Sequence, residues 1–143
     1  MPISTLYNSK LLILKNHFNT NKLTTMTRLF LLKPGFTDKN IDDHTKFYCP
    51  DCAMIQGIIS LYPKLKELIE IIYVDFERPR KKLIEYVGEE NQGCPCLVIS
   101  KQEINGNINT SYFKNYSDYL FINSTAEIAQ YLSDKFGIGV PHP

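Results

Sequence analysis

The chain has 143 residues, enough for one domain with one hydrophobic core. Its 16 Lys and Arg against 15 Asp and Glu leave a formal net charge of +1, which argues against a dedicated nucleic-acid-binding surface. Its uninterrupted apolar runs, such as residues 29–32, are far too short to span a membrane. The composition therefore excludes a membrane-spanning protein and argues against a nucleic-acid-binding one.

The first residues of the chain differ from the rest, because they are rich in Ser, Thr and Asn. Their apolar patch at residues 11–14 is too short for a secretory signal, and no Arg of the kind that marks a mitochondrial presequence precedes Arg28. We expect residues 1–25 to be a mobile extension or to precede the natural start at Met26. Residues 26–137 are then the domain and residues 138–143 a tail, in the cytoplasm.

The first predicted elements are a strand and a helix. A short apolar run predicts a buried strand at residues 28–33, and a polar loop follows at residues 36–48. Residues 50–62 carry apolar side chains at helical spacing. Pro50 suits the first helical position, and Pro63 ends the helix.

The remaining elements alternate in the same way. An Ile-, Tyr- and Val-rich run predicts a strand, Gly88 ends the next helix, and Ser124 with Glu127 has the spacing of a capping box before the last helix, which Gly137 ends. The patterns predict strands at 28–33, 68–76, 96–99 and 118–122, and helices at 50–62, 79–87 and 124–136. The order β-α-β-α-β-β-α indicates an α/β fold.

Two cysteines at the start of the first helix point to redox chemistry. Unpaired amide donors and the helix dipole favour a thiolate at Cys49, which is therefore the expected nucleophile. Cys52 lies one turn further and is placed to close a disulfide with Cys49, the role of a resolving thiol. Asp51 opposes the activation, since its carboxylate disfavours a nearby negative charge.

A strand, a Cys-Pro-x-Cys at a helix start, and Pro95 opening a later strand resemble the thioredoxin-like superfamily. The glutaredoxin and glutathione-transferase N-domain branch is the most similar, over about residues 28–136. Residues 30–38 and 47–50 also resemble a bacterial family of unknown function with this fold. The resemblance implies a central four-stranded mixed sheet flanked by helices. It also implies that Pro95 is a cis-proline beside Cys49.

The same resemblance implies ligand-binding residues. Residues 124–132 are similar to a transferase segment in which a Glu-Ser pair holds glutathione, and Ser124 and Thr125 occupy the positions of that pair. Lys33 aligns with a lysine that contacts glutathione. The loop before Cys49 is longer than in glutaredoxins, and the Gly-Gly-x-x-Asp segment of that family is missing. Glutathione is therefore an alternative ligand or cosubstrate.

Two further cysteines flank Pro95. In a thioredoxin-like fold the residue before the proline approaches the active cysteine, which makes Cys94 a second resolving thiol or a substrate contact. A buried, inert thiol is the equal alternative for Cys94, and for Cys96 a core position is favoured. Alternatively, Cys49, Cys52, Cys94 and Cys96 form a four-thiolate set for zinc or an iron–sulfur cluster.

The second helix begins with a basic run, at residues 78–82. Basic side chains at a helix N-terminus oppose the helix dipole. We interpret the run as a solvated helix start, with binding of an anionic tripeptide or a phosphate as the alternative.

The sequence as a whole predicts a cytoplasmic thiol–disulfide oxidoreductase. Its catalytic residues are Cys49, Cys52 and Pro95, and its partner is a disulfide-containing protein or a small thiol such as glutathione. It binds neither nucleic acid nor membrane, and it holds no cofactor. Two alternatives stay open: a non-catalytic glutathione- or peptide-binding module, and the zinc or iron–sulfur protein.

Overall fold

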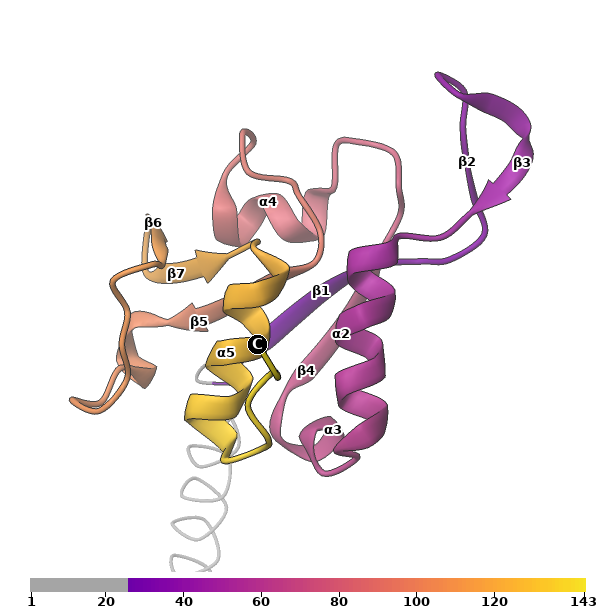
Figure 1. Cartoon of the computed structure of the whole chain (residues 1–143). Helices are drawn as coiled ribbons and strands as arrows, with labels where there is room; N and C mark the ends of the chain where they lie inside the picture. Colours follow the sequence, from indigo (N-terminus) through magenta and orange to yellow (C-terminus); the bar gives the residue numbers. More distant parts are fainter. Residues whose placement is uncertain (1–25) are drawn as a thin grey trace, which may run out of the picture.

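A computed structural model describes residues 26–143, so the expectation for residues 1–25 lies outside the described residues. Mixed α/β architecture is confirmed, with a five-stranded sheet of strand order β4-β1-β5-β7-β6 (Figure 1). The strands are β1 (Arg28–Leu32), β4 (Glu70–Val74), β5 (Cys96–Ser100), β6 (Lys114–Tyr116) and β7 (Tyr119–Ile122). The α-helices are α2 (Pro50–Leu61), α3 (Leu65–Leu68), α4 (Lys81–Val87) and α5 (Thr125–Phe136).

The sheet is mixed, as predicted, but it has five strands rather than four. Strand β1 runs parallel to β4 and antiparallel to β5, while β5, β7 and β6 are successively antiparallel. The additional strand is β6, a short edge strand with all three residues exposed. The chain turns from β6 into β7 at Ser117, which has a positive φ of 51°. An exposed polar edge strand lacks the apolar alternation from which strands are predicted.

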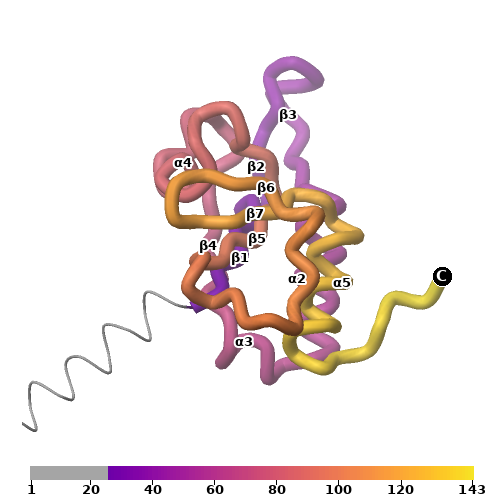
Figure 2. The backbone as a smooth tube through the Cα atoms, turned by 90° about the vertical axis from the view of Figure 1, so that its left-hand side faces the viewer, coloured from indigo at the N-terminus to yellow at the C-terminus, as the bar shows by residue number. Residues whose placement is uncertain are grey.

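Each face of the sheet packs against its own helices. Leu29 and Leu31 of β1 point into the core under α2 and α5, whereas Phe30 points into the core under α4. Figure 2 shows the three layers, with α4 on one side of the strands and α2 and α5 on the other. Both faces are buried, and for this reason β1 and β5 appear in the sequence as continuous apolar runs.

The loop predicted at residues 36–48 is instead a β-hairpin, formed by β2 (Phe36–Asp38) and β3 (Asp42–Phe47). It projects away from the body of the molecule (Figures 1 and 2). The hairpin is fixed at its base, where Phe36 stacks on Phe76 with ring centroids 4.3 Å apart. Apart from Phe36 and Phe47 its strand residues are polar, and the middle of β3 is exposed, so periodicity did not indicate the two strands.

The other predicted elements are confirmed within a few residues. The strand predicted from residue 68 begins at Glu70, because the short helix α3 takes up residues before it. Gly137 ends α5 in the left-handed conformation, at φ 69° and ψ 25°. The Ser124 hydroxyl caps α5 by accepting from the Glu127 N–H at 3.4 Å. A complete capping box, which the sequence analysis missed, joins Ser100 and Glu103 at the 3-10 helix η1 (Lys101–Glu103).

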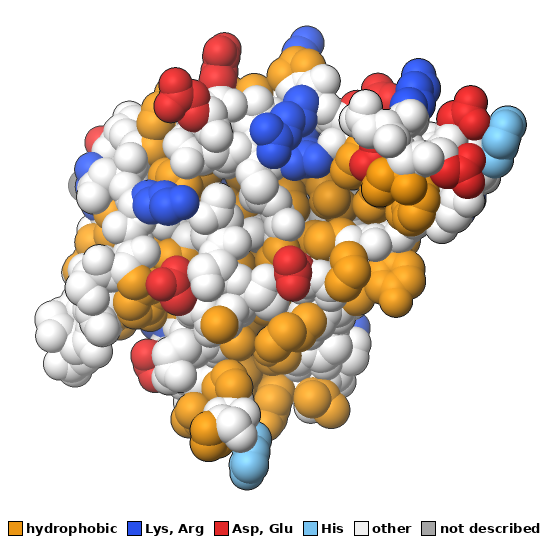
Figure 3. Space-filling model, turned by 45° about the horizontal axis from the view of Figure 1, so that its top comes forward, with side chains coloured by type: hydrophobic (Ala, Val, Ile, Leu, Met, Phe, Trp, Pro, Cys, Tyr) orange, Lys and Arg blue, Asp and Glu red, His pale blue; other side chains and the backbone are white. Residues whose placement is uncertain are grey.

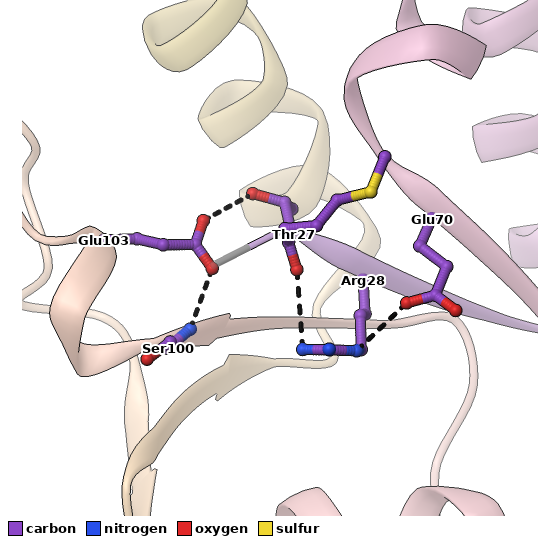
Figure 4. A network of polar contacts seen from close by, with 6 residues as sticks. Thr27, Arg28, Glu70, Ser100 and Glu103 are labelled. Carbon is purple, nitrogen blue, oxygen red and sulfur yellow. Dashed lines mark hydrogen bonds and ion pairs between the residues drawn. The ribbon is translucent and has the colours of Figure 1, made fainter. Parts of the chain in front are cut away.

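A polar network ties the start of β1 to neighbouring elements (Figure 4). The Thr27 hydroxyl donates to one oxygen of Glu103 at 3.0 Å, and the Ser100 N–H donates to the other at 3.0 Å. Arg28 forms an ion pair with Glu70 at 3.1 Å. These contacts join β1 to η1 and to β4.

Two findings concern the chain beyond the sheet. None of the helices within residues 26–143 is long and apolar enough to cross a membrane.

The residues that follow α5 pack back against the domain. The Ser133 hydroxyl of α5 donates to the Gly139 carbonyl at 2.8 Å, and Ile138 packs against the core under α2 and α5.

Candidate functional site

Cys49 occupies the N-cap of α2, with extended backbone angles of φ −81° and ψ 114°. Its sulfur accepts a hydrogen bond from the Cys52 N–H at 3.1 Å, one of the donors that a helix start leaves unpaired. Pro50 follows at the first helical position, where its missing N–H removes no helical bond. The Cys49 side chain is partly exposed. A thiolate at Cys49 would thus be stabilised by the helix start and accessible to a reactant.

Cys52 is placed differently, since only 5% of its surface is exposed. Its sulfur accepts a weak hydrogen bond from the Leu32 N–H at 3.5 Å. Burial, reinforced by the hydrogen bond with Cys49, raises the pKa of Cys52 to about 12. Cys52 is therefore a neutral thiol near pH 7, in contact with the more exposed sulfur.

The segment before β5 completes the site. The Cys94–Pro95 peptide bond is cis, and Pro95 is buried. The Cys49 thiol lies 3.9 Å from the Cys94 carbonyl oxygen, a distance at which it donates a weak hydrogen bond. Burial raises the pKa of the Cys94 thiol to about 11, against an opposing effect of Arg80. Cys49, Cys52 and Cys94 thus meet at the ends of α2 and β5.

Cys96 lies apart from these three cysteines. It is fully buried and belongs to the core cluster under α4, on the opposite face of the sheet from Cys52. Burial raises the pKa of its thiol. Among residues 26–143 no group of three or more His, Cys, Asp or Glu has an arrangement that would hold a metal ion. Cys96 is therefore not gathered with the other three cysteines of the proposed four-thiolate set.

The residues expected to hold glutathione are not engaged with one another. Lys33 follows β1 and forms an exposed ion pair with Asp75 at 2.8 Å. Ser124 caps α5, and Thr125 is the partly exposed first residue of that helix. Helix α5 begins at the same end of the molecule as α2 (Figure 1).

An apolar cavity of about 320 Å³ adjoins the two cysteines of α2, and the sequence did not indicate it. No charged side chain lines it. Its walls are formed by Leu31, Leu32, Pro34, Tyr48, Cys49, Cys52, Ala53, Gln56 and Tyr73. Figure 3 shows hydrophobic side chains gathered at the base of the β2–β3 hairpin, with Lys and Arg side chains beside them. The cavity offers an apolar group room beside the sulfur of Cys49.

The basic run at residues 78–82 is not a solvated helix start throughout. Arg80 is 8% exposed, which contradicts that interpretation, whereas Arg78, Lys81 and Lys82 are exposed. The Arg80 guanidinium donates to the Gln92 carbonyl, two residues before Cys94. The sequence analysis named Arg80 only as part of the basic run, and it did not indicate Gln92 or its contact with Arg80. The only signal was the conflict between a basic run and the helix dipole.

Comparison with known proteins assigns the chain to a family. The sequence profile of the family described as "Protein of unknown function (DUF3088)" matches residues 26–140, and the chain belongs to this family. No curated protein and no solved structure shows significant similarity to it. The family description carries no activity, so a function has to be argued from the site.

Proposed function

We propose that this DUF3088 protein is a thiol–disulfide oxidoreductase with a thioredoxin-like fold. The observation that carries the proposal is the contact between Cys49 Sγ and the Cys52 N–H at 3.1 Å, at the first turn of α2. It brings an accessible sulfur and a buried thiol within one helical turn. The adjacent cis peptide bond of Pro95 and the parallel pairing of β1 with β4 support the thioredoxin-like assignment.

The reaction begins with the Cys49 thiolate, which attacks one sulfur of a substrate disulfide. The substrate S–S bond breaks, its second sulfur leaves as a thiolate and takes a proton, and a mixed disulfide forms on Cys49. Cys52 then loses its proton and attacks Cys49 Sγ, which releases the first substrate sulfur as a thiol. The substrate disulfide gains two electrons, and the Cys49–Cys52 pair is oxidised to a disulfide.

The surroundings of the two sulfurs suit these roles. Burial keeps Cys52 protonated until the mixed disulfide forms, since its pKa is raised to about 12. The apolar cavity beside Cys49 accepts an uncharged group next to the substrate sulfur. The substrate is therefore a disulfide in a protein or a small molecule. The reductant that restores the pair is a thiol of the glutathione class or a protein dithiol. A reducing compartment such as the cytoplasm supplies such thiols.

The experiment is a redox titration. The protein is equilibrated over a series of reduced and oxidised glutathione, alkylated and mapped by mass spectrometry. The proposal predicts one reversible two-electron transition that consumes the thiols of Cys49 and Cys52 together. A pair that stays reduced over the whole series contradicts it.

A further inference from the structure

Arg80 is a buried cation whose partners are backbone carbonyls. Its Nε donates to the Asp75 carbonyl at 3.0 Å, and its two terminal nitrogens donate to the carbonyls of Phe76 and Gln92. The ring of Phe76 lies 5.9 Å from the guanidinium carbon. All three guanidinium nitrogens thus donate a hydrogen bond. Together these bonds hold the residues after β4 against the segment that leads to β5.

The side chain of Gln92 also binds the backbone of Arg80. Its oxygen accepts from the backbone N–H of Arg80 at 2.7 Å, and its amide nitrogen donates to the Glu89 carbonyl at 2.7 Å. Two residues later, the Cys94 carbonyl lies 3.9 Å from Cys49 Sγ. The position of residues 92–95 relative to Cys49 therefore depends on the contact between Arg80 and Gln92.

Among residues 26–143, no carboxylate forms an ion pair with this buried charge. In the described part of the chain the ion pairs involve Arg28, Lys33 and His44, and none involves Arg80. Burying an unpaired cation is costly, and accordingly burial lowers the pKa of Arg80. Among the described residues, the thiols of Cys94, Cys52 and Cys49 are the groups that would act on Arg80 with a negative charge if they ionised.

We propose that Arg80 is a positioning residue for the cysteine site: it fixes residues 92–95 against Cys49 and supplies the positive charge that balances a thiolate there. This proposal rests on the proposed function only in one respect: the disulfide exchange proposed above is what gives the thiolate a use. Before reaction Arg80 is a buried cation with no carboxylate partner in the described part of the chain, and ionisation of a cysteine provides a counter-charge.

Other charges around the site are more exposed. Asp51 lies in the first turn of α2, Lys33 pairs with Asp75, and Arg78 lies on the same loop as Arg80. Arg78 also acts on Cys94, but it is solvated, and water and salt screen its charge. Arg78 is therefore the matched control for Arg80: the same charge, two residues away and exposed.

The test compares reduced wild type with R80Q, R80K and R78Q. The rate of Cys49 alkylation is followed by peptide mapping across pH, with circular dichroism as the check on folding. We expect R80Q to slow alkylation near pH 7 by about tenfold, the effect of removing one charge at intermediate dielectric. The difference between R80Q and wild type should shrink at alkaline pH. R80K should keep most of the neutral-pH rate, and R78Q should change it less than R80Q.

A second variant protects the test against poor folding of R80Q. Q92E retains Arg80 and places a carboxylate beside it, so it should slow Cys49 alkylation near pH 7 in the same way. Rates equal to wild type in folded R80Q or Q92E would overturn the proposal, as would an equal loss at every pH. Failure of both variants to fold would assign Arg80 a purely structural role, which also overturns it. Alkylation needs no disulfide exchange, so this result is independent of whether the Cys49–Cys52 pair oxidises.

Discussion

The backbone N–H of Cys52 donates a hydrogen bond to the sulfur of Cys49 across 3.1 Å at the start of α2. The two residues thereby differ in environment although they are one helical turn apart. Cys49 is partly exposed at the cap, and Cys52 is buried beneath it. This difference gives the two thiols distinct expected reactivities.

Alkylation of the reduced protein should follow that order. Burial raises the pKa of Cys52 to about 12 and that of Cys94 to about 11, so both thiols are protonated near pH 7, and Cys52 is also shielded from solvent. We expect iodoacetamide to modify Cys49 well before Cys52 or Cys94, as measured by peptide mapping over time. Labelling of Cys52 at the same rate as Cys49 in folded protein would contradict the assignment of roles.

The raised pKa of Cys52 also predicts a loss of stability at alkaline pH. Between its ordinary pKa of 9.0 and the folded value of about 12, the folded protein keeps a proton that the unfolded chain has lost. The free energy of unfolding should therefore fall as pH rises through this interval, by up to about 1.4 kcal/mol per pH unit for this one group. Below pH 9 the contribution is fully present.

The measurement is urea unfolding under reducing conditions at several pH values, for wild type and C52A. Burial also raises the pKa of other groups, such as Cys96 and Tyr131. Their ionisation at high pH lowers the free energy of unfolding of both proteins, so it cancels in the comparison. The variant should lose stability less steeply above pH 9. Parallel curves for the two proteins would refute the buried-thiol description of Cys52.

Cys96 should behave as a core residue. It is fully buried in the cluster that also contains Phe30 and Val98, so C96A should destabilise the protein by about 1 kcal/mol through lost packing. C96S should cost more, about 1–3 kcal/mol, because its hydroxyl is buried without an assured partner. Neither change should affect Cys49 alkylation. A marked loss of Cys49 reactivity in C96A would return Cys96 to the site.

Ser124 provides a test of capping against ligand binding. Its hydroxyl accepts from the Glu127 N–H, so S124A should destabilise the protein by about 1 kcal/mol, while S124D, another good cap, should retain most of the stability. Thermal unfolding measures both. If glutathione affinity rather than stability changes in S124A, the resemblance to the transferase segment is the better guide to this residue.

The elements that the sequence predicted are those that bury side chains. Strands β1 and β5 appear as apolar runs because helices cover both faces, and Pro63 and Gly137 mark helix ends by their backbone requirements. The apolar stripe of α2 was only partly informative. Ile55 and Ile59 are buried, whereas Met54 and Leu61 are 49% and 75% exposed.

What the sequence did not reveal depends on contacts between distant residues. The edge strand β6 and most of the β2–β3 hairpin are polar, so backbone pairing rather than an apolar pattern marks them as strands. Arg80 is buried by donating to three backbone carbonyls, and no pattern of side chains marks such partners. The apolar cavity joins walls from β1, α2 and β4. The cysteine spacing indicated where the site begins but not what surrounds it.

The central claim, that Cys49 attacks disulfides and Cys52 resolves them, is tested most directly by trapping the mixed disulfide. Reduced C52S and C49S are each treated with oxidised glutathione and with a small apolar disulfide, then analysed by intact mass without reductant. We expect one stable mixed disulfide on Cys49 of C52S, formed faster with the apolar reagent. In wild type the adduct should resolve to the Cys49–Cys52 disulfide. Adducts forming equally on C49S, or none on folded C52S, would contradict it.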